Sequence, residues 1–229
     1  MLIDLNIHGV SAFGAPLPFD SQLEKSFSNW LPDGMKNVAQ TRQQEFIAGR
    51  YCAFQASKVV GYELSQLPAA ATREPIWPEG ILGSITHSKQ MAISCVSVSD
   101  EISSIGIDAE ELMKIGLAQE IERVIATEEE LLMIAGADYQ MGITILFSAK
   151  EALYKALFPL ARTFIDFKEV KLTKLLSDKR LFELELKSSN PKLQGYLGRY
   201  EGSFKLIGET VVTVVSIPKV VSKELYVHS

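Results

Sequence analysis

The stretch Phe147-Ser148-Ala149-Lys150-Glu151-Ala152-Leu153-Tyr154-Lys155 decides how the rest of the chain is interpreted. Its large side chains recur at spacings of three and four residues, which predicts a helix from Ser148 to about Leu160. Ser148 with Glu151 three residues later matches a capping box, and Glu151 with Lys155 matches an ion pair along one helix face. Taken alone, the stretch favours an ordinary capped surface helix.

Two acidic residues upstream change this interpretation. The segments 91–98 and 102–110 alternate like strands and are separated by a short turn, which predicts a β-hairpin. Antiparallel pairing about residue 100 would set residue 92 opposite residue 108. His87 would then lie just beyond the hairpin end where Asp108 and Glu110 emerge.

Asp108 and Glu110 are two residues apart on the predicted strand, so their side chains point to the same face. Neighbouring carboxylates repel each other unless they are protonated, solvated or bridged by a cation. An oxygen-only pair suits Mg²⁺, which keeps most of its ligand positions for water and phosphate. The alternative is a solvent-facing strand end with two acids, and the pair alone does not decide between the two.

The remaining pattern predicts a mixed α+β protein rather than regular βαβ units. A helix is expected over residues 41–61, and it places Arg42 and Arg50 near one face. Residues 67–83 are predicted to form a structured loop that contains Arg73. Residues 11–18 are also predicted to form a loop, within an N-terminal segment that is hard to place. Further helices are expected over 113–123 and from Thr127, where a second capping box occurs. Strands are expected over 170–175, 181–187, 193–200 and 210–217.

Composition narrows the class of protein. The chain has 229 residues and a net charge of −5, so no overall basic charge favours nucleic acid or an anionic membrane. Cys52 and Cys95 lack metal-binding or redox spacing and are expected to be buried free thiols. No secretory signal and no apolar run of transmembrane length is evident. We expect a soluble, cytoplasmic protein.

Five segments, in order, resemble the Sfp-type 4′-phosphopantetheinyl transferase superfamily. Its three signature segments are matched by residues 83–87 (GSITH), 106–110 (GIDAE) and 147–155 (FSAKEALYK). Residues 45–53 (EFIAGRYCA) and 73–80 (REPIWPEG) resemble the enterobactin synthase component D subgroup. Ala109 occupies a position that varies between acidic and neutral residues in the family.

The resemblance implies a pseudo-dimer of two similar α/β halves, with the active site in the cleft between them. We expect the halves to be residues 1–103 and 104–229, within a chain that is a monomer.

The resemblance also implies transfer of the phosphopantetheine arm of coenzyme A to a serine of an apo acyl or peptidyl carrier protein. Asp108, Glu110 and Glu151 would bind Mg²⁺, with Mn²⁺ as an alternative. Glu151, or a metal-bound water that it orients, would accept the serine proton, and Lys155 would contact a phosphate. The residues expected to bind coenzyme A are Arg42, Arg50, Arg73, Ser84, His87 and Lys155.

Other interpretations stay open at this point. Another Mg²⁺-dependent phosphate-transfer enzyme could use the same carboxylates, and a silent module could bind coenzyme A or a carrier without reaction. The carrier served, in siderophore or other peptide, polyketide or fatty-acid synthesis, is not specified. Residues 150–180 carry eight basic and four acidic residues, so part of this segment, including Lys168 and Lys171, is expected to face an acidic carrier.

Overall fold

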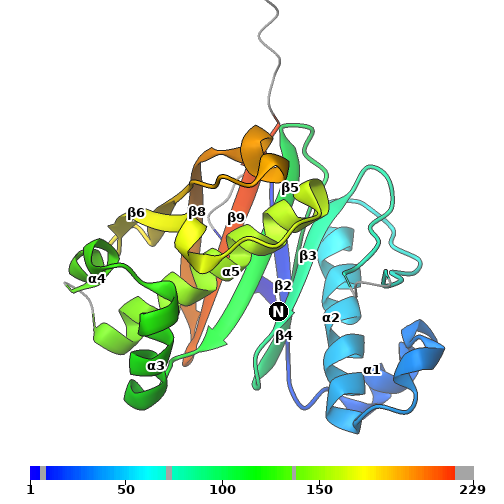
Figure 1. Ribbon diagram of the computed structural model, residues 1–229. Coiled ribbons are helices and arrows are strands. Elements are labelled where there is room, and N and C mark those ends of the chain that lie inside the picture. The colour runs from blue at the N-terminus through cyan, green and yellow to red at the C-terminus, as the bar shows by residue number, and fades with distance from the viewer. Residues whose placement is uncertain (6–8, 71–73, 136–137, 220–229) are drawn as a thin grey trace, which may run out of the picture.

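Two antiparallel sheets lie side by side, and each packs against one long helix (Figure 1). The computed structural model describes residues 1–5, 9–70, 74–135 and 138–219. The first sheet has the order β1-β2-β4-β3, formed by β1 (Leu2–Ile3), β2 (Ser11–Pro16), β3 (Leu82–His87) and β4 (Met91–Ser97). The second has the order β5-β9-β8-β7-β6, formed by β5 (Ile102–Glu111), β6 (Val170–Leu176), β7 (Leu181–Leu186), β8 (Gly198–Ile207) and β9 (Thr210–Pro218). The predicted α+β class is confirmed.

The helices divide between the two sheets. On the side of the first sheet lie α1 (Ser21–Ser26), the 3₁₀ turns η1 (Ser28–Trp30) and η2 (Asp33–Met35), and α2 (Gln40–Val59). On the side of the second lie α3 (Ile115–Ile125), α4 (Glu128–Ile134), α5 (Tyr139–Ala161), η3 (Phe167–Glu169) and η4 (Pro191–Tyr196). Small buried residues such as Ala48 and Cys52 let α2 lie close on β2 and β4. The predicted helix over residues 41–61 is confirmed.

The predicted loop over residues 11–18 is wrong, because most of it forms β2, which pairs with β4 along its length. Its small residues serve close packing rather than a turn. A Cβ on Gly14 would lie 2.9 Å from Ile3 Cδ1 and 3.1 Å from Met91 Cε. The glycine and alanine residues that suggest a loop in the sequence instead let the core approach the strand.

The predicted hairpin between residues 91–98 and 102–110 is also wrong. β4 is paired on one edge with β2 and on the other with β3, so it has no edge left for β5. The hairpin is instead β3–β4, in which His87 pairs with Ala92. β5 crosses to the second sheet and pairs with β9. His87 still lies near Asp108, because β3 packs against β5, with Ile107 N donating to Ser84 Oγ at 3.1 Å.

The predicted start of the signature helix at Ser148 is wrong by nine residues. α5 begins at Tyr139, and its N-cap is Asp138, whose carboxylate accepts the Met141 backbone N–H at 3.1 Å. Ser148 therefore lies in the middle of a helix and is fully buried. The predicted capping box at Thr127 is confirmed, since Thr127 and Glu130 each bond the other's backbone N–H.

The predicted strand over residues 193–200 is only partly correct, because η4 occupies its first part and β8 begins at Gly198. The predicted strands over 170–175, 181–187 and 210–217 are confirmed as β6, β7 and β9, and the predicted helix over 113–123 as α3. Cys52 and Cys95 are buried free thiols, as expected, and burial raises the pKa of each to about 12.

A shared core joins the two sheets. One apolar cluster combines Ile3, Met91 and Ile93 from the first sheet with Ile107 and Val214 from the second. Polar contacts also cross this junction, including Lys205 Nζ to the Asp4 carbonyl at 3.1 Å. Within the described ranges, no helix is long and apolar enough to cross a membrane. The candidate site lies where β3 and β5 meet.

Candidate active site

Four charged side chains expected in the site come from two elements, Asp108 and Glu110 from β5 and Glu151 and Lys155 from α5. Asp108 is 3% exposed, and its Oδ1 lies 2.5 Å from Lys155 Nζ. Lys155 also donates to Thr86 Oγ1 at 3.2 Å. Among the described ion pairs, Lys155 is thus bound to Asp108 and not to Glu151, as its helical spacing had suggested.

The carboxylates are close enough to oppose one another's ionisation. Burial raises the pKa of Glu110 to about 7, and the charges of Asp108 and Glu151 add to that increase. Burial and then the charge of Asp108 raise the pKa of Glu151, while Lys155 lowers it. Because the charge of Asp108 favours the neutral forms of Glu110 and Glu151, the group favours a bound cation.

The donor chemistry of Asp108, Glu110 and Glu151 fits a hard divalent cation, since all of their ligand atoms are oxygens. Within the described part of the chain, no group of three or more His, Cys, Asp or Glu side chains is arranged to hold a metal ion. One Asp108 oxygen is already bound by Lys155, so a cation and this lysine would share the same carboxylate.

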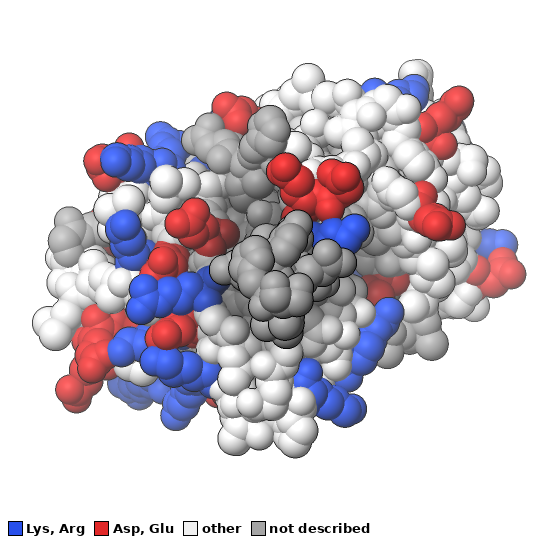
Figure 2. Space-filling view, turned by 90° about the horizontal axis from the view of Figure 1, so that it is seen from above, with Lys and Arg blue, Asp and Glu red and all other residues white. Residues whose placement is uncertain are grey.

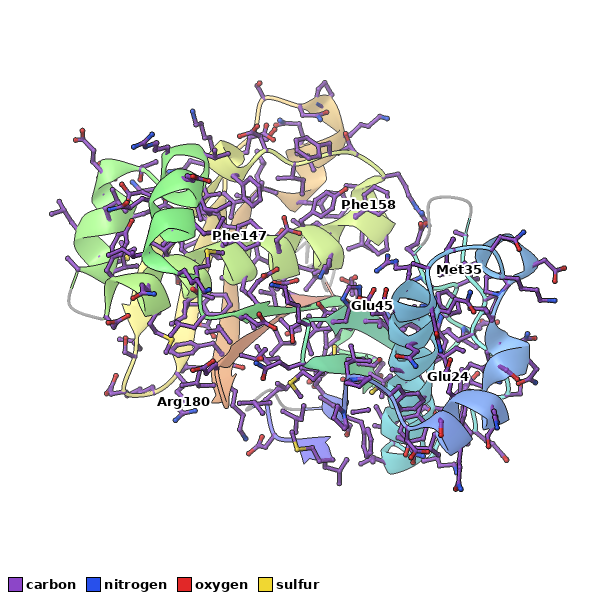
Figure 3. All side chains as sticks on the ribbon, turned by 90° about the horizontal axis from the view of Figure 1, so that it is seen from below. Glu24, Met35, Glu45, Phe147, Phe158 and Arg180 are labelled. Carbon is purple, nitrogen blue, oxygen red and sulfur yellow. The ribbon has the colours of Figure 1, made fainter. Side chains whose placement is uncertain are left out.

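Arg42 on α2 and His87 on β3 lie on the first-sheet side of the candidate site, and His87 is near enough to Asp108 for the charge of Asp108 to act on it. Arg42 Nη1 lies 2.6 Å from His87 Nε2 and 2.9 Å from Glu45 Oε2. Because arginine can only donate, His87 Nε2 must accept, which makes this imidazole neutral. The pKa of His87 is lowered, first by burial. Figure 3 shows Glu45 on the side of α2 next to the strands, with Phe147 and Phe158 along α5 across from it.

Arg50 is the most unusual of the predicted coenzyme A ligands. It is 5% exposed, and its Nε and Nη2 atoms have no hydrogen-bond partner among the described residues. Its guanidinium lies over the Phe46 ring at 3.7 Å. Burial and the nearby charge of Arg42 lower the pKa of Arg50 to about 10. A buried cation without a hydrogen-bonded acceptor is costly to the fold, and an anionic ligand would relieve that cost.

The other predicted ligands differ in position. Ser84 lies at the junction of the sheets, where its hydroxyl oxygen accepts the Ile107 N–H, leaving its own proton to donate elsewhere. Arg73 lies outside the described residues.

Three further residues lie at this site that were not predicted from the sequence. Thr86 Oγ1 donates to Asp108 Oδ1 at 3.4 Å, Ser148 Oγ donates to Asp108 Oδ2 at 2.8 Å, and Thr213 on β9 contacts Ser148. Thr86 and Ser148 stand inside the signature segments, so their position was a usable signal. Thr213 lies about one hundred residues from Asp108 in a strand without any motif, and only the β5–β9 pairing reveals it.

One small cavity adjoins the candidate site, and a larger one lies elsewhere in the first half. The small one, of about 50 Å³, adjoins Glu151 and has Tyr154, Phe164 and Phe167 in its walls. The larger one, of about 450 Å³, lies between α1 and α2 and is lined by none of the acidic site residues. The position of the chemistry therefore follows from the charged groups and not from cavity size.

The basic segment 150–180 is less exposed than its composition implies. Lys150 is 2% exposed and pairs with buried Glu130 at 2.8 Å, and Lys155 pairs with Asp108. Lys171 pairs with the exposed Glu129. Figure 2 shows basic and acidic side chains interspersed on the left of that view, and Figure 3 places Arg180 far from α2. Lys150 and Lys155 are therefore paired with buried carboxylates and add no free positive charge to the surface.

Two adjacent segments of the chain match models of known protein families. Residues 32–97 match the family model of the 4′-phosphopantetheinyl transferase N-terminal domain, and residues 104–208 match that of the 4′-phosphopantetheinyl transferase superfamily. The two models together cover most of the chain and meet at the change from one sheet to the other.

Relatives with curated names are similar over part of their length. Enterobactin synthase component D of Salmonella typhi is 32% identical over 151 residues, which are 64% of this chain and 62% of the relative. Its counterpart in Escherichia coli K12 is 36% identical over 132 residues, 56% of this chain and 61% of the relative. The 4′-phosphopantetheinyl transferase PptT of Mycobacterium tuberculosis is 32% identical over 148 residues, 62% of this chain and 64% of the relative. The chain thus spans slightly less than two thirds of the length of these relatives.

Proposed function

The chain belongs to the 4′-phosphopantetheinyl transferase superfamily, and on this basis we propose that it moves the phosphopantetheine arm of coenzyme A onto a serine of an apo carrier protein. The serine oxygen would form a bond to the phosphorus that carries the arm, and the bond to the leaving phosphate would break. Adenosine 3′,5′-bisphosphate would be released. The curated names of the relatives, which include enterobactin synthase component D, favour carriers of peptide or siderophore synthesis.

One observation carries the proposal: the first half holds Arg50, a buried cation with two unpartnered nitrogens, and the second half holds carboxylates that oppose one another's ionisation. The buried Arg50 guanidinium, with Arg42 and His87 nearby, suits the phosphates of coenzyme A. We also retain Ser84 and Arg73 as proposed ligands. The β3–β5 junction would hold the pyrophosphate between the two groups.

Asp108, Glu110 and Glu151 would hold the divalent cation, Mg²⁺ or Mn²⁺, which when bound neutralises charge on the pyrophosphate. Lys155 would move from Asp108 to a phosphate oxygen and stabilise the negative charge that develops there. Glu151, whose pKa is raised by burial, would accept the proton of the incoming serine. The acceptor serine belongs to the carrier, so this chain needs no nucleophile of its own.

The division into halves at residues 103 and 104, a monomeric state and a cytoplasmic location are parts of the same proposal. They are consistent with coenzyme A and carrier proteins as substrates.

A mass measurement tests the function. Incubation with coenzyme A, Mg²⁺ and a panel of apo carriers should add about 340 Da, the mass of the arm, to at least one carrier. Glu151→Gln should abolish the addition while the protein remains folded. If no carrier gains this mass and coenzyme A is bound without turnover, the chain is a binding module. If coenzyme A is cleaved without a carrier, the chain is a different phosphate-transfer enzyme.

A further inference from the structure

The Asp108 carboxylate is held from two sides by different elements. On one side, Lys155 Nζ and Thr86 Oγ1 donate to Oδ1 at 2.5 and 3.4 Å. On the other, Ser148 Oγ donates to Oδ2 at 2.8 Å. These bonds fix the rotation of the carboxylate plane, because each oxygen has its own donor.

Behind Ser148 lies a second hydroxyl. Thr213 stands directly opposite Asp108 on β9, and both side chains point toward α5. Its Oγ1 lies 2.8 Å from Ser148 Oγ and 2.8 Å from the Ser148 carbonyl oxygen. Both Ser148 and Thr213 are fully buried, so water does not compete for these bonds.

The number of available protons decides which of the two hydroxyls is the hydrogen-bond donor. An ionised carboxylate can only accept, so the single hydroxyl proton of Ser148 is directed to Asp108. In the contact between the two hydroxyls, Thr213 must therefore be the donor. Its single proton is shared between two acceptors, Ser148 Oγ and the Ser148 carbonyl oxygen. Donation into Ser148 Oγ polarises its O–H bond and strengthens its bond to Asp108.

We propose that Ser148 and Thr213 are positioning residues, a two-hydroxyl relay that holds Oδ2 of Asp108 and so turns Oδ1 toward the site. The inference rests on the proposed function, in which Asp108 helps to hold the divalent cation. Hydrogen bonds that orient a ligating carboxylate change metal affinity by about tenfold to a hundredfold when removed.

Three substitutions separate this role from packing. Ser148→Ala removes the donor to Asp108, and Thr213→Val removes the second hydroxyl at nearly constant volume. Thr213→Ser keeps that hydroxyl and is the rescue variant. Ser104→Ala is the matched control, because Ser104 Oγ is also buried and joins β5 to α5, through the Ala156 carbonyl at 2.6 Å, without contacting Asp108.

The first readout is metal binding. It is measured by the electron paramagnetic resonance of Mn²⁺, with and without coenzyme A. The dissociation constant of Mn²⁺ should rise about tenfold in Ser148→Ala and severalfold in Thr213→Val, and stay near wild type in Thr213→Ser and Ser104→Ala. The second readout is transfer, in which the half-saturating Mg²⁺ concentration should rise by similar factors at unchanged carrier KM.

The outcomes separate this inference from the proposed function. Weakened Mn²⁺ binding without transfer to any carrier would support the relay and contradict the proposed function. Transfer with the same Mg²⁺ dependence in all variants, or losses in Ser104→Ala equal to those in Ser148→Ala, would overturn the relay. A wild-type protein that binds no Mn²⁺ would overturn it as well.

Discussion

Arg50 shows at the scale of one residue how a ligand site can be recognised from an unmet electrostatic requirement. Its guanidinium is buried, and two of its nitrogens have no acceptor in the described part of the chain. Folding desolvates this charge, and the contact of the guanidinium with the Phe46 ring at 3.7 Å offsets only part of that cost. Selection for stability alone would not keep such a group, and this is the reason that we propose Arg50 as a ligand of an anion.

Replacing Arg50 should therefore separate stability from binding. Arg50→Met should leave the melting temperature unchanged or raise it, and should weaken adenosine 3′,5′-bisphosphate binding by about 100-fold, as expected for lost charged hydrogen bonds. Calorimetric titration and thermal unfolding measure the two effects. Arg199→Met, at an exposed arginine on β8, is the control and should change neither. Unchanged binding in Arg50→Met would remove Arg50 from the site.

Glu110 makes stability depend on pH. Its pKa is near 4.5 when unfolded and about 7 when folded, so between these values the folded state binds the extra proton. The raised pKa therefore costs the folded state nothing below pH 4.5. The free energy of unfolding falls as the pH rises through 7. Glu110→Gln removes this penalty.

In EDTA, the free energy of unfolding of Glu110→Gln relative to wild type should be about 1–2 kcal/mol higher at pH 8 than at pH 5. This figure is reduced for the partial exposure of Glu110. Urea unfolding at the two pH values measures it. The same gain at both pH values would show that Glu110 is ionised normally in the folded protein.

At the scale of elements, the contact between β5 and α5 sets the geometry of the site. A Cβ on Gly106 would lie 2.0 Å from the Ala152 carbonyl oxygen and 2.5 Å from the Ala156 nitrogen, so this strand touches the helix backbone directly. Only glycine permits this approach, which brings Lys155 to Asp108.

Gly106→Ala should force α5 away from β5, reduce transfer at least tenfold and lower the free energy of unfolding by more than about 2 kcal/mol. Gly116→Ala, on α3 where no atom lies within 4 Å of the added Cβ, should change stability by less than about 1 kcal/mol. Steady-state transfer assays and urea unfolding compare the two. Equal effects would show that the close contact at Gly106 relaxes without cost.

Two ion pairs on α4 offer a matched comparison of buried and exposed charge. Glu130 and Lys150 are buried, and Lys150 also donates to the Ile125 and Phe167 carbonyls at 2.6 and 3.1 Å. The neighbouring Glu129 pairs with Lys171 in an exposed setting. The first pair joins α3, α4, α5 and η3, so it supports the wall beside Glu151.

Lys150→Met should cost about 3–5 kcal/mol, because it leaves Glu130 charged and buried without its partner. Lys171→Ala should cost less than about 1 kcal/mol. Chemical unfolding of both variants provides the measurement, and similar losses would mean that the buried pair is hydrated in solution.

At the scale of the whole molecule, the two halves are not independent. Their sheets share one apolar cluster, and Ser203 on β8 donates to the Leu5 carbonyl near the N-terminus. Arg162 at the end of α5 pairs with Glu74 from the first half. The candidate site uses side chains from both proposed halves, so it would be complete only when they are docked.

Residues 1–103 and 104–229 expressed separately should therefore not unfold cooperatively, because each exposes its side of the common core. Mixing the two should restore a cooperative transition and detectable transfer. Circular dichroism during thermal unfolding and the mass assay test this. Two separately cooperative fragments would show that the shared cluster adds little to either half.

Local sequence was sufficient for features with a short period or spacing. The 41–61 helix, the Thr127 capping box, three of the four C-terminal strands and the side-by-side placement of Asp108 and Glu110 all depend on residues within a few positions of one another. The signature segments also indicated the family before any geometry was known, and the family models support it.

Tertiary structure decided everything that depends on which edges and faces meet. β5 pairs with β9, more than one hundred residues away, because both edges of β4 are already occupied. Ser148 is a buried donor rather than a cap because α5 begins at Tyr139, and Lys155 binds Asp108 rather than Glu151 because Gly106 brings the strand against the helix. Periodicity reports the local face of an element, whereas partners across the core are chosen by packing and burial.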